Sequence, residues 1–357
     1  MNVDRPKAIT LKDVARSAGI SVNAASRALR DMPDIGEETK KRVRHIAREL
    51  GYRKNLSAVR LKTKRSLQIG LVVNDVANPF MSFLLRGVER VCIEHGYSVL
   101  LSDAAHKEKA EDDRIRKFIE IGVDGLLFVP VDRSRDGYLR LLKALEQSTV
   151  PYIVTAAYLP GVESSYVACD DELGGYLAAE HLYGLGHRHF SLLFGNLNTS
   201  PMRDRRRGFE KYLTEVGLDP ASHIACCTPP EGGDDMREAV KVLLSTLDKS
   251  TAVFCYCDND AMDLYAALYP LGIRIPRDLS VVGYDDIRFA ECLYPPLTTV
   301  HLGPEMLGEI ATRELLTMIK SPYENVQVKR QIVIRPHLVL RGSTAPPREG
   351  AIPYKEV

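Results

Sequence analysis

A short segment near the N-terminus, from Val22 to Arg30, carries polar side chains in a pattern suited to contacting DNA. Ala25, Ala28 and Leu29 have the spacing of residues that pack inward on a helix. The side chains that would then face outward are Val22, Asn23, Ser26, Arg27 and Arg30. Asn and Arg present paired hydrogen-bonding groups that match the edges of adenine and guanine in the major groove. This outward face therefore predicts base contacts.

Three short helices are predicted to hold this face in place. Thr10 precedes an apolar stripe with helical spacing, and Asp13 is placed to complete a capping box. Gly19 ends that helix and Ser21 caps the next one, so the two helices meet in a tight turn. A third helix is predicted over residues 37–50. This order is that of a helix-turn-helix, whose second helix enters the major groove; a three-helix bundle without a DNA role is the alternative.

Positive charge is concentrated in the first 66 residues. They hold 17 Lys and Arg against 7 Asp and Glu, although the whole 357-residue chain has a formal net charge of only +1. The rest of the chain is correspondingly acidic. A basic segment on an acidic body favours a polyanionic partner for that segment. A solvated basic tail is the other interpretation, and the helical periodicity argues against it.

Composition and cysteine usage predict a cytoplasmic, nucleoid-associated protein without membrane contact. The N-terminal residues lack the apolar core of a secretory signal, and no apolar run approaches the ~18 residues of a membrane helix. The seven cysteines include no Cys-x-x-Cys pair, so neither a metal nor a cofactor is expected. Buried apolar positions explain these cysteines better than metal ligation or catalysis does.

From Leu67 onward the pattern changes to short apolar runs separated by helical segments. Runs rich in β-branched residues between helices are typical of parallel strands buried on both faces. There are more runs than one sheet holds comfortably, which favours two doubly wound lobes with a ligand between them at the strand carboxyl ends. The predicted strands cover residues 68–74, 97–102, 125–129, 152–156, 166–170, 190–194, 224–227, 252–257, 279–283 and 297–301.

Several motifs resemble those of the lactose/galactose-repressor family. Near the N-terminus they are Thr10-Leu11-Lys12-Asp13-Val14-Ala15, Ala18-Gly19-Ile20-Ser21, Ala25-Ser26-Arg27 and Leu50-Gly51-Tyr52. Further on they are Asn78-Pro79-Phe80, Arg205-x-x-Gly208-Phe209, Asn259-Asp260-x-Met262 and Val282-Gly283-Tyr284-Asp285-Asp286. The resemblance covers residues 10 to about 342. It implies an all-α helix-turn-helix head followed by an α/β, periplasmic-binding-protein-like core of two doubly wound parallel-sheet lobes.

The resemblance also implies roles for residues of the head. Val22 and Asn23 would read bases, and Arg27 would make a further base contact. The other expected DNA-binding residues of the head are Thr10 and the phosphate contacts Ser21, Ser26 and Thr39. Gly36 stands where the family usually has Ser, which removes a cap hydroxyl, although Gly is an acceptable helix cap.

The segment 55–66 resembles the family's hinge helix through Asn55, Ala58 and Leu61. An ordinary linker would be rich in Gly, Ser or Pro, whereas this one sets a short apolar pattern among cations. In relatives the segment folds on the operator in the minor groove, and Leu61 would then wedge between two base steps. A flexible basic linker is the other interpretation. Lys54 replaces a proline that relatives often carry.

For the core, the resemblance implies an effector site between the lobes. Its expected members are Phe80, Arg205, Asn259 and Asp285. Their donors, acceptors and apolar face suit a sugar or another hydroxyl-rich molecule. Helix capping is the alternative role for Asn259 and Asp285, and it is the role expected of Asp260. Departures from the family pattern leave open a different sugar, a phosphorylated sugar bound through Arg203 and Arg205, or no small molecule. The departures are Met81, Asp171, Asp263, Tyr265 and Pro304.

The sequence thus predicts a transcriptional repressor that binds a palindromic double-stranded operator as a homodimer and responds to a sugar-like effector. No leucine heptads follow residue 341, so no tetramerising coil is expected. A sugar-transport protein and an enzyme are the alternatives; the basic head argues against the first, and no catalytic motif supports the second. The predicted domains are a head at 1–54, a hinge at 55–66, a core at 67–342 and a tail at 343–357. Lobe 1 is expected at about 67–168 and 300–330, and lobe 2 at about 169–299 and 331–342.

Overall fold

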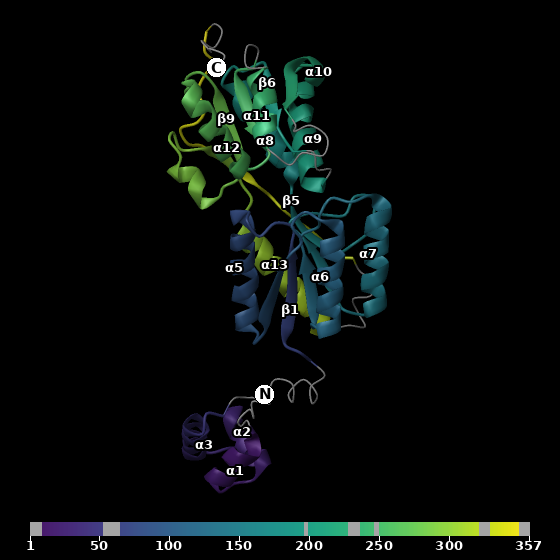
Figure 1. The fold of residues 1–357 in the computed structure, drawn as a ribbon, viewed down its shortest axis with the longest axis vertical. Helices are drawn as coiled ribbons and strands as arrows, with labels where there is room; N and C mark the ends of the chain where they lie inside the picture. Colours follow the sequence, from purple (N-terminus) through teal and green to yellow (C-terminus); the bar gives the residue numbers. More distant parts are fainter. Residues whose placement is uncertain are drawn as a thin grey trace, which may run out of the picture. The chain divides into compact units, whose positions relative to one another are not determined.

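The computed structural model describes residues 9–52, 65–195, 199–227, 236–245, 250–320 and 329–349. The chain divides into two compact units, Met1–Ser66 and Leu67–Val357. The first unit is helical and is coloured purple in Figure 1, and the second is an α/β unit coloured from blue to yellow. The predicted hinge residues Asn55, Ala58 and Leu61 lie outside the described residues.

The described part of the first unit contains three helices, which are α1 (Leu11–Ala18), α2 (Val22–Leu29) and α3 (Glu37–Glu49). The α1 helix begins after Thr10, whose backbone N–H donates to the Asp13 carboxylate at 2.9 Å. It ends at Gly19, which has φ 65°. The α2 helix begins after Ser21, whose Oγ accepts a bond from the Ala24 N–H at 3.1 Å. Small side chains let the helices approach closely, and the buried core is Val14, Ala15, Ala18, Ala25, Ala28, Val43 and Ala47.

The first lobe of the larger unit is a six-stranded parallel sheet with helices on both faces (Figure 1). In the order β11-β5-β4-β3-β1-β2, the strands are Gln331–Ile334, Tyr166–Cys169, Tyr152–Thr155, Gly125–Phe128, Gln68–Val73 and Ser98–Asp103. Its helices are α5 (Pro79–Glu94), α6 (Glu108–Ile121), α7 (Arg135–Ser148) and α13 (Pro304–Lys320). Along β1, Leu71 and Val73 pack with α5 and α13, whereas Val72 packs with α6 and α7. Burial on both faces explains the continuous apolar runs of these strands.

The second lobe has the same kind of sheet. In the order β12-β10-β9-β8-β6-β7, the strands are His337–Val339, Thr298–His301, Ser280–Asp285, Ala252–Cys255, Phe190–Leu193 and Ile224–Cys227. Neighbouring strands are parallel except that β12 runs antiparallel to β10. The helical segments are α8 (Asp171–Gly184), α9 (Ser200–Glu215), α10 (Pro220–His223), α11 (Met236–Leu244), α12 (Asp258–Leu268), η1 (Tyr269–Leu271) and η2 (Arg288–Cys292).

The chain passes between the lobes three times: from β5 to α8, from β10 to α13, and from β11 to β12. The passages contact one another. Cys169 in the first donates its S–H to the carbonyl oxygen of Leu302 in the second, at 3.2 Å. The rings of His301 in the second and His337 in the third have centroids 4.9 Å apart. The three connections therefore form one junction between the lobes.

The third passage corrects one predicted lobe boundary. The expectation placed residues 331–342 in lobe 2, but β11 pairs with β5 in the sheet of lobe 1, with Ile332 beside Val167. The chain enters lobe 2 only at β12. Neither β11 nor β12 is among the predicted strands.

The segment after residue 341 packs on lobe 2, where the sequence predicts a tail. Ser343 is fully buried. Its carbonyl accepts a bond from the Val281 N–H at 2.9 Å, and its Oγ accepts a bond from the Thr298 N–H at 2.8 Å. The buried imidazole of His187 contacts the carbonyl oxygen of Ala345 at 2.9 Å. These contacts extend the core beyond the predicted limit at residue 342.

Two pairs of helices are packed so closely that glycine is required between them. In lobe 2, a Cβ on Gly175 of α8 would lie 1.9 Å from the carbonyl oxygen of Arg205 on α9. A Cβ on Gly208 of α9 would lie 1.8 Å from the carbonyl oxygen of Glu172 on α8. In lobe 1, a Cβ on Gly87 of α5 would lie 2.0 Å from a carbonyl oxygen of α13. Each lobe therefore has a helix pair in direct backbone contact.

Candidate functional site

The exposed face of α2 is the candidate DNA-reading surface. Ala25 and Ala28 are buried in the head, whereas Val22 is 42% exposed and Asn23 is exposed. Ser26 is half-buried on the same helix. A half-exposed apolar side chain next to an exposed amide matches the combination of methyl contact and base-edge hydrogen bonding used in the major groove. The structure thus places the predicted base-reading residues on the surface.

Arg27 is held by an acid of the head. Its guanidinium lies 2.6 Å from the carboxylate of Asp34, and this hydrogen bond raises the pKa of Arg27 above its ordinary value. The Nε of Arg27 is buried and has no hydrogen-bond partner. A base contact by Arg27 would therefore compete with the Asp34 pair.

The predicted phosphate contacts also have local roles. The Ser21 hydroxyl accepts the cap bond of α2, which leaves its proton free to be donated. The Thr10 hydroxyl donates to Asp13 at 2.6 Å. Thr39 lies half-buried in the first turn of α3, where helix N–H groups favour an anion.

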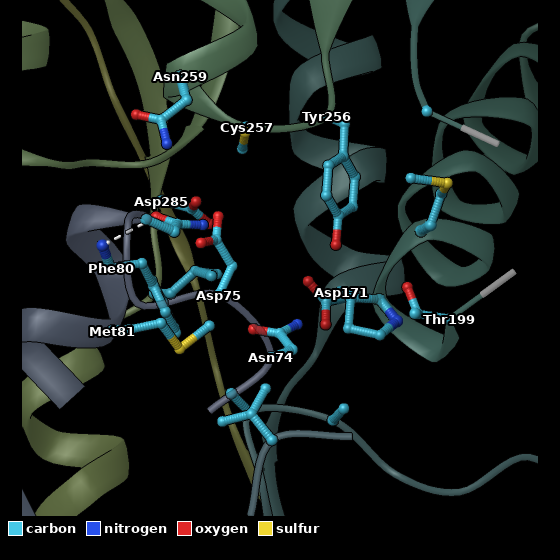
Figure 2. Close-up of a pocket in the computed structure, with 18 of the residues that line it drawn as sticks. Asn74, Asp75, Phe80, Met81, Asp171, Thr199, Tyr256, Cys257, Asn259 and Asp285 are labelled. Carbon is cyan, nitrogen blue, oxygen red and sulfur yellow. Dashed lines mark hydrogen bonds between the residues drawn. The ribbon is translucent and has the colours of Figure 1, made fainter. Parts of the chain in front are cut away.

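A cavity of about 360 Å³ lies between the two lobes at the carboxyl ends of their strands (Figure 2). All four predicted effector residues, Phe80, Arg205, Asn259 and Asp285, line it. Phe80 comes from the first turn of α5, where the Asn78 side chain accepts a bond from the Phe80 N–H at 2.9 Å. The remaining three come from lobe 2. The fold therefore brings together residues that lie more than 200 positions apart.

Arg205 is bound on several sides by the protein. Its Nε donates to the Asp171 carboxylate at 2.9 Å, and its Nη1 donates to the carbonyl oxygen of Tyr256 at 2.5 Å. Its Nη2 lies 3.7 Å from the carboxylate of Asp285. The guanidinium also packs over the rings of Tyr256 and Tyr284, 4.5 and 3.6 Å from their centroids. Burial opposes its charge, but Asp171 and Asp285 hold the pKa of Arg205 above its ordinary value.

Asp285 stands at the end of β9 in a backbone conformation that favours glycine, with φ 104°. Burial raises the pKa of Asp285 well above its ordinary value, although Arg205 opposes the shift. The following helical segment, η2, is capped at Ile287, whose N–H donates to Asp258 at 2.9 Å. Asp285 is therefore at the cavity and does not cap this segment.

The start of α12 supplies two further polar groups. Asn259 is half-buried at the cavity, and the helix is capped at Cys257. Asp260 was expected to act only as a cap. It also lines the cavity, and its Oδ2 is buried without a hydrogen-bond partner. Burial raises the pKa of Asp260 to about 7, although hydrogen bonds from Cys257 oppose this shift.

Several cavity residues were not predicted from the sequence. They are Asn74, His106, Thr199, Tyr256 and Cys257. Asn74 directly follows β1 and Tyr256 directly follows β8, so their position after a buried strand was a usable signal. Figure 2 shows Asn74, Asp171, Thr199 and Tyr256 around the same space. By contrast, Arg203 is exposed and is not among the residues that line the cavity.

The described ranges contain neither a metal-binding cluster nor a membrane-spanning helix. Within the described ranges, no group of three or more His, Cys, Asp or Glu is placed to hold a metal ion. None of the helices in the described part of the chain is both long enough and apolar enough to cross a membrane.

Comparisons with known proteins agree with both units. A family model described as bacterial regulatory proteins, lacI family, matches residues 10–55, and a periplasmic binding protein-like domain matches residues 179–344. The ribose operon repressor of Haemophilus influenzae is 32% identical over 336 residues, which cover 94% of this chain and 98% of the repressor. The transcriptional regulator DegA of Bacillus subtilis is 31% identical over 337 residues, with the same coverage.

Solved structures give the same result. The Lac repressor dimer bound to operator and the anti-inducer ONPF has a TM-score of 0.81 at 26% identity, covering 95% of this chain and all of that one. A LacI family regulator from Enterococcus faecium with bound ribose has a TM-score of 0.68 at 28% identity, covering 79% of this chain and all of that one.

A helix-turn-helix unit joined to a two-lobed core with an interlobe cavity defines a DNA-binding regulator under the control of a small molecule. The chain belongs to the LacI family of bacterial regulatory proteins. It is a regulator of transcription and not an enzyme.

Proposed function

We propose that the protein represses transcription by binding a palindromic operator as a dimer, and that a hydroxyl-rich effector in the interlobe cavity controls this binding. This proposal rests on one observation. The same chain combines an exposed face on α2 with a cavity lined by Phe80, Arg205, Asn259 and Asp285. Bound ribose in a family member supports a sugar-like effector. We place the activity in the cytoplasm, at the nucleoid, where operator DNA is found.

On the DNA side, residues 1–54 form the reading head. Val22 and Asn23 contact base edges, and Arg27 joins them after leaving Asp34. The phosphate-facing set is Thr10, Ser21, Ser26 and Thr39. Residues 55–66, with Asn55, Ala58 and Leu61, act as the hinge that enters the minor groove. Two heads in a dimer then read the two halves of a palindrome.

On the effector side, closure of the two lobes around a bound ligand controls operator binding. A ligand that contacts Phe80 from lobe 1 and Asp285 from lobe 2 is bound more tightly by the closed arrangement than by an open one. Differential affinity of this kind shifts the equilibrium between the two arrangements and so changes operator affinity.

The test uses the full-length protein and operators selected from random duplex DNA. Selected sites should be palindromic, and Asn23→Ala should lower affinity for them by about 5- to 100-fold while leaving non-specific binding nearly unchanged. In fluorescence anisotropy with a bound effector, Asp285→Ala should abolish the effector's influence on operator affinity and leave operator binding itself intact.

Asp113→Ala is the matched control for Asp285→Ala, because Asp113 is exposed on α6 and does not line the cavity. A normal effector response in Asp285→Ala would remove Asp285 from the effector site. Recovery of sequences without a repeated half-site would contradict palindromic reading by a dimer.

A further inference from the structure

Carboxylates dominate the charge of the interlobe cavity. Its acidic lining residues are Asp75, Asp171, Asp260, Asp263 and Asp285, and the basic ones are Arg205 and His106. Burial raises the pKa of Asp260 and Asp285, so these two groups carry less than a full negative charge near pH 7. Acidic groups still outnumber basic ones in the lining, which disfavours an anionic ligand unless a cation is free to bind it.

Arg205 does not provide that free cation. Its Nε and Nη1 are occupied by Asp171 and the carbonyl oxygen of Tyr256, and its Nη2 faces Asp285. His106 lies 3.7 Å from the carboxylate of Asp75. Arg203, the other arginine considered for a phosphate, is exposed and outside the lining. A phosphorylated sugar would thus bring two more negative charges to a site whose cations are already paired.

Some buried polar side-chain atoms at this cavity are hydrogen-bond acceptors without a donor among the described residues. Asn74 Oδ1 and Asp260 Oδ2 are both acceptors, and both are buried without a hydrogen bond from any residue that the structure describes. The Thr199 hydroxyl, whose residue is 7% exposed, also has no partner. Buried polar groups are normally paired, so a ligand that carries donors would satisfy these atoms. Neutral sugars supply donors through hydroxyls, whereas an ammonium group supplies three donors and a positive charge.

The position of Asp260 favours the charged donor. Asp263 lies one turn further along α12 and lines the same cavity, so the two carboxylates repel each other. This repulsion adds to the larger effect of burial, which raises the pKa of Asp260. A hydroxyl would satisfy the orphaned Oδ2 but would leave this repulsion in place. An ammonium group does both: it donates a hydrogen bond to the Asp260 carboxylate, and its positive charge offsets the repulsion between Asp260 and Asp263.

We propose that the effector is a polyhydroxylated amine, such as an amino sugar, whose ammonium group binds the Asp260 carboxylate while its hydroxyls contact Asn74 and Thr199. This inference rests on the proposed function, because it assigns a ligand class to the same cavity. Asp260 is then the residue that distinguishes an amine from the corresponding neutral sugar.

The test measures binding by calorimetry and by thermal shift, with the full-length protein and matched pairs of probes. The pairs are glucosamine and glucose, galactosamine and galactose, and mannosamine and mannose, and glucose 6-phosphate is added as the anionic probe. In at least one pair the amine should bind about 10- to 100-fold more tightly than its neutral partner, as expected of a hydrogen bond to a charged group. Glucose 6-phosphate should bind no more tightly than glucose.

Asp260→Asn then removes the charge while keeping the size of the side chain. It should reduce the preference for the amine to less than about threefold, and it should leave binding of the neutral sugar within about threefold. Asp113→Asn on α6 is the control and should keep the full preference. The midpoint of thermal unfolding without probe shows that each variant is folded.

The inference is overturned if no amine binds more tightly than its neutral partner, if the phosphorylated probe binds best, or if the preference survives Asp260→Asn. The proposed function has a separate readout. Any probe that binds the cavity and changes operator affinity in anisotropy supports effector control, whichever member of a pair it is. Binding of a probe with no change in operator affinity would instead count against the proposed function and leave the ligand class intact.

Discussion

At the scale of single residues, ionisation of the buried Asp260 carboxyl group lowers the stability of the folded protein, and this effect should depend on pH. Burial raises its pKa to about 7 in the folded protein, against an ordinary value of 3.8. An acid whose pKa is raised by folding stabilises the fold below its unfolded pKa, and this contribution is lost as the pH rises through the folded value. The cost is therefore absent near pH 4 and complete above pH 7.

Asp260→Asn should remove that cost. Relative to the unaltered protein, the free energy of unfolding of the variant should rise by about 1–3 kcal/mol at pH 8, by a smaller amount at intermediate pH, and change little at pH 4. Urea denaturation at the two pH values measures the difference. An equal gain at both values would mean that the carboxylate does not change its ionisation in this range.

Asp34 gives a second residue-scale prediction, for DNA binding. Because its carboxylate holds Arg27 at 2.6 Å, Asp34→Asn should free the guanidinium and raise affinity for a specific operator by up to about fivefold, the range of an exposed ion pair. Glu49→Gln is the control, since it removes one exposed charge of the head that pairs with His45 and leaves Arg27 unaffected. An equal increase in both variants would show that only net charge matters.

The types and spacing of the residues indicated much of this site, but the sequence did not indicate which residues bond to one another. The outward face of α2 follows from the spacing of Ala25 and Ala28, and Arg205 and Asp285 came from motifs. The bonds that neutralise Arg205 join it to Asp171 and Tyr256, which lie 34 and 51 positions away. Such pairs depend on the packing of α8, α9 and β8, which no local pattern specifies.

At the scale of elements, the contact between α8 and α9 places Arg205. Gly175→Ala should force these helices apart, because the new Cβ would lie 1.9 Å from the carbonyl oxygen of Arg205 itself. We expect the free energy of unfolding to fall by about 3 kcal/mol and effector affinity to weaken. Chemical denaturation and calorimetry measure the two effects.

Gly184→Ala on the same helix is the matched control for Gly175→Ala. A Cβ at Gly184 would meet nothing within 4 Å, so the change should stabilise α8 by up to about 1 kcal/mol through helix propensity. If both variants lost stability equally, close backbone contact would not explain the need for glycine at position 175.

Strands buried on both faces were predictable, and so were the edge strands β2 and β7, whereas the edge strands β11 and β12 were not. The central strands appear in the sequence as continuous apolar runs because helices cover both of their faces. The strands β11 and β12 have only four and three residues and are largely half-buried or exposed, so they form no apolar run that stands out in the sequence. Ser343 attaches to lobe 2 through its backbone carbonyl and through its hydroxyl, which accepts from the Thr298 N–H and donates to the Val281 carbonyl oxygen. Isolated polar contacts of this kind leave no periodic pattern in the sequence.

At the scale of the whole molecule, palindromic reading requires two chains. One α2 helix covers a single half-site, so the functional form should be a dimer. Light scattering of the full-length protein should give a mass of two chains, both free and on a palindromic duplex. A mass of four chains would contradict the predicted dimer.

The junction where Cys169, Leu302, His301 and His337 meet has a mechanical consequence for the core. Two bodies tied at one place by three covalent connections can swing about that place, but they cannot slide past each other or separate. Displacement during such a swing is smallest at the fulcrum and increases with distance from it. The ligand cavity lies next to this junction, because Cys169 and Leu302 also line it. A small closing movement at the cavity is therefore accompanied by a larger displacement at the distant ends of the lobes.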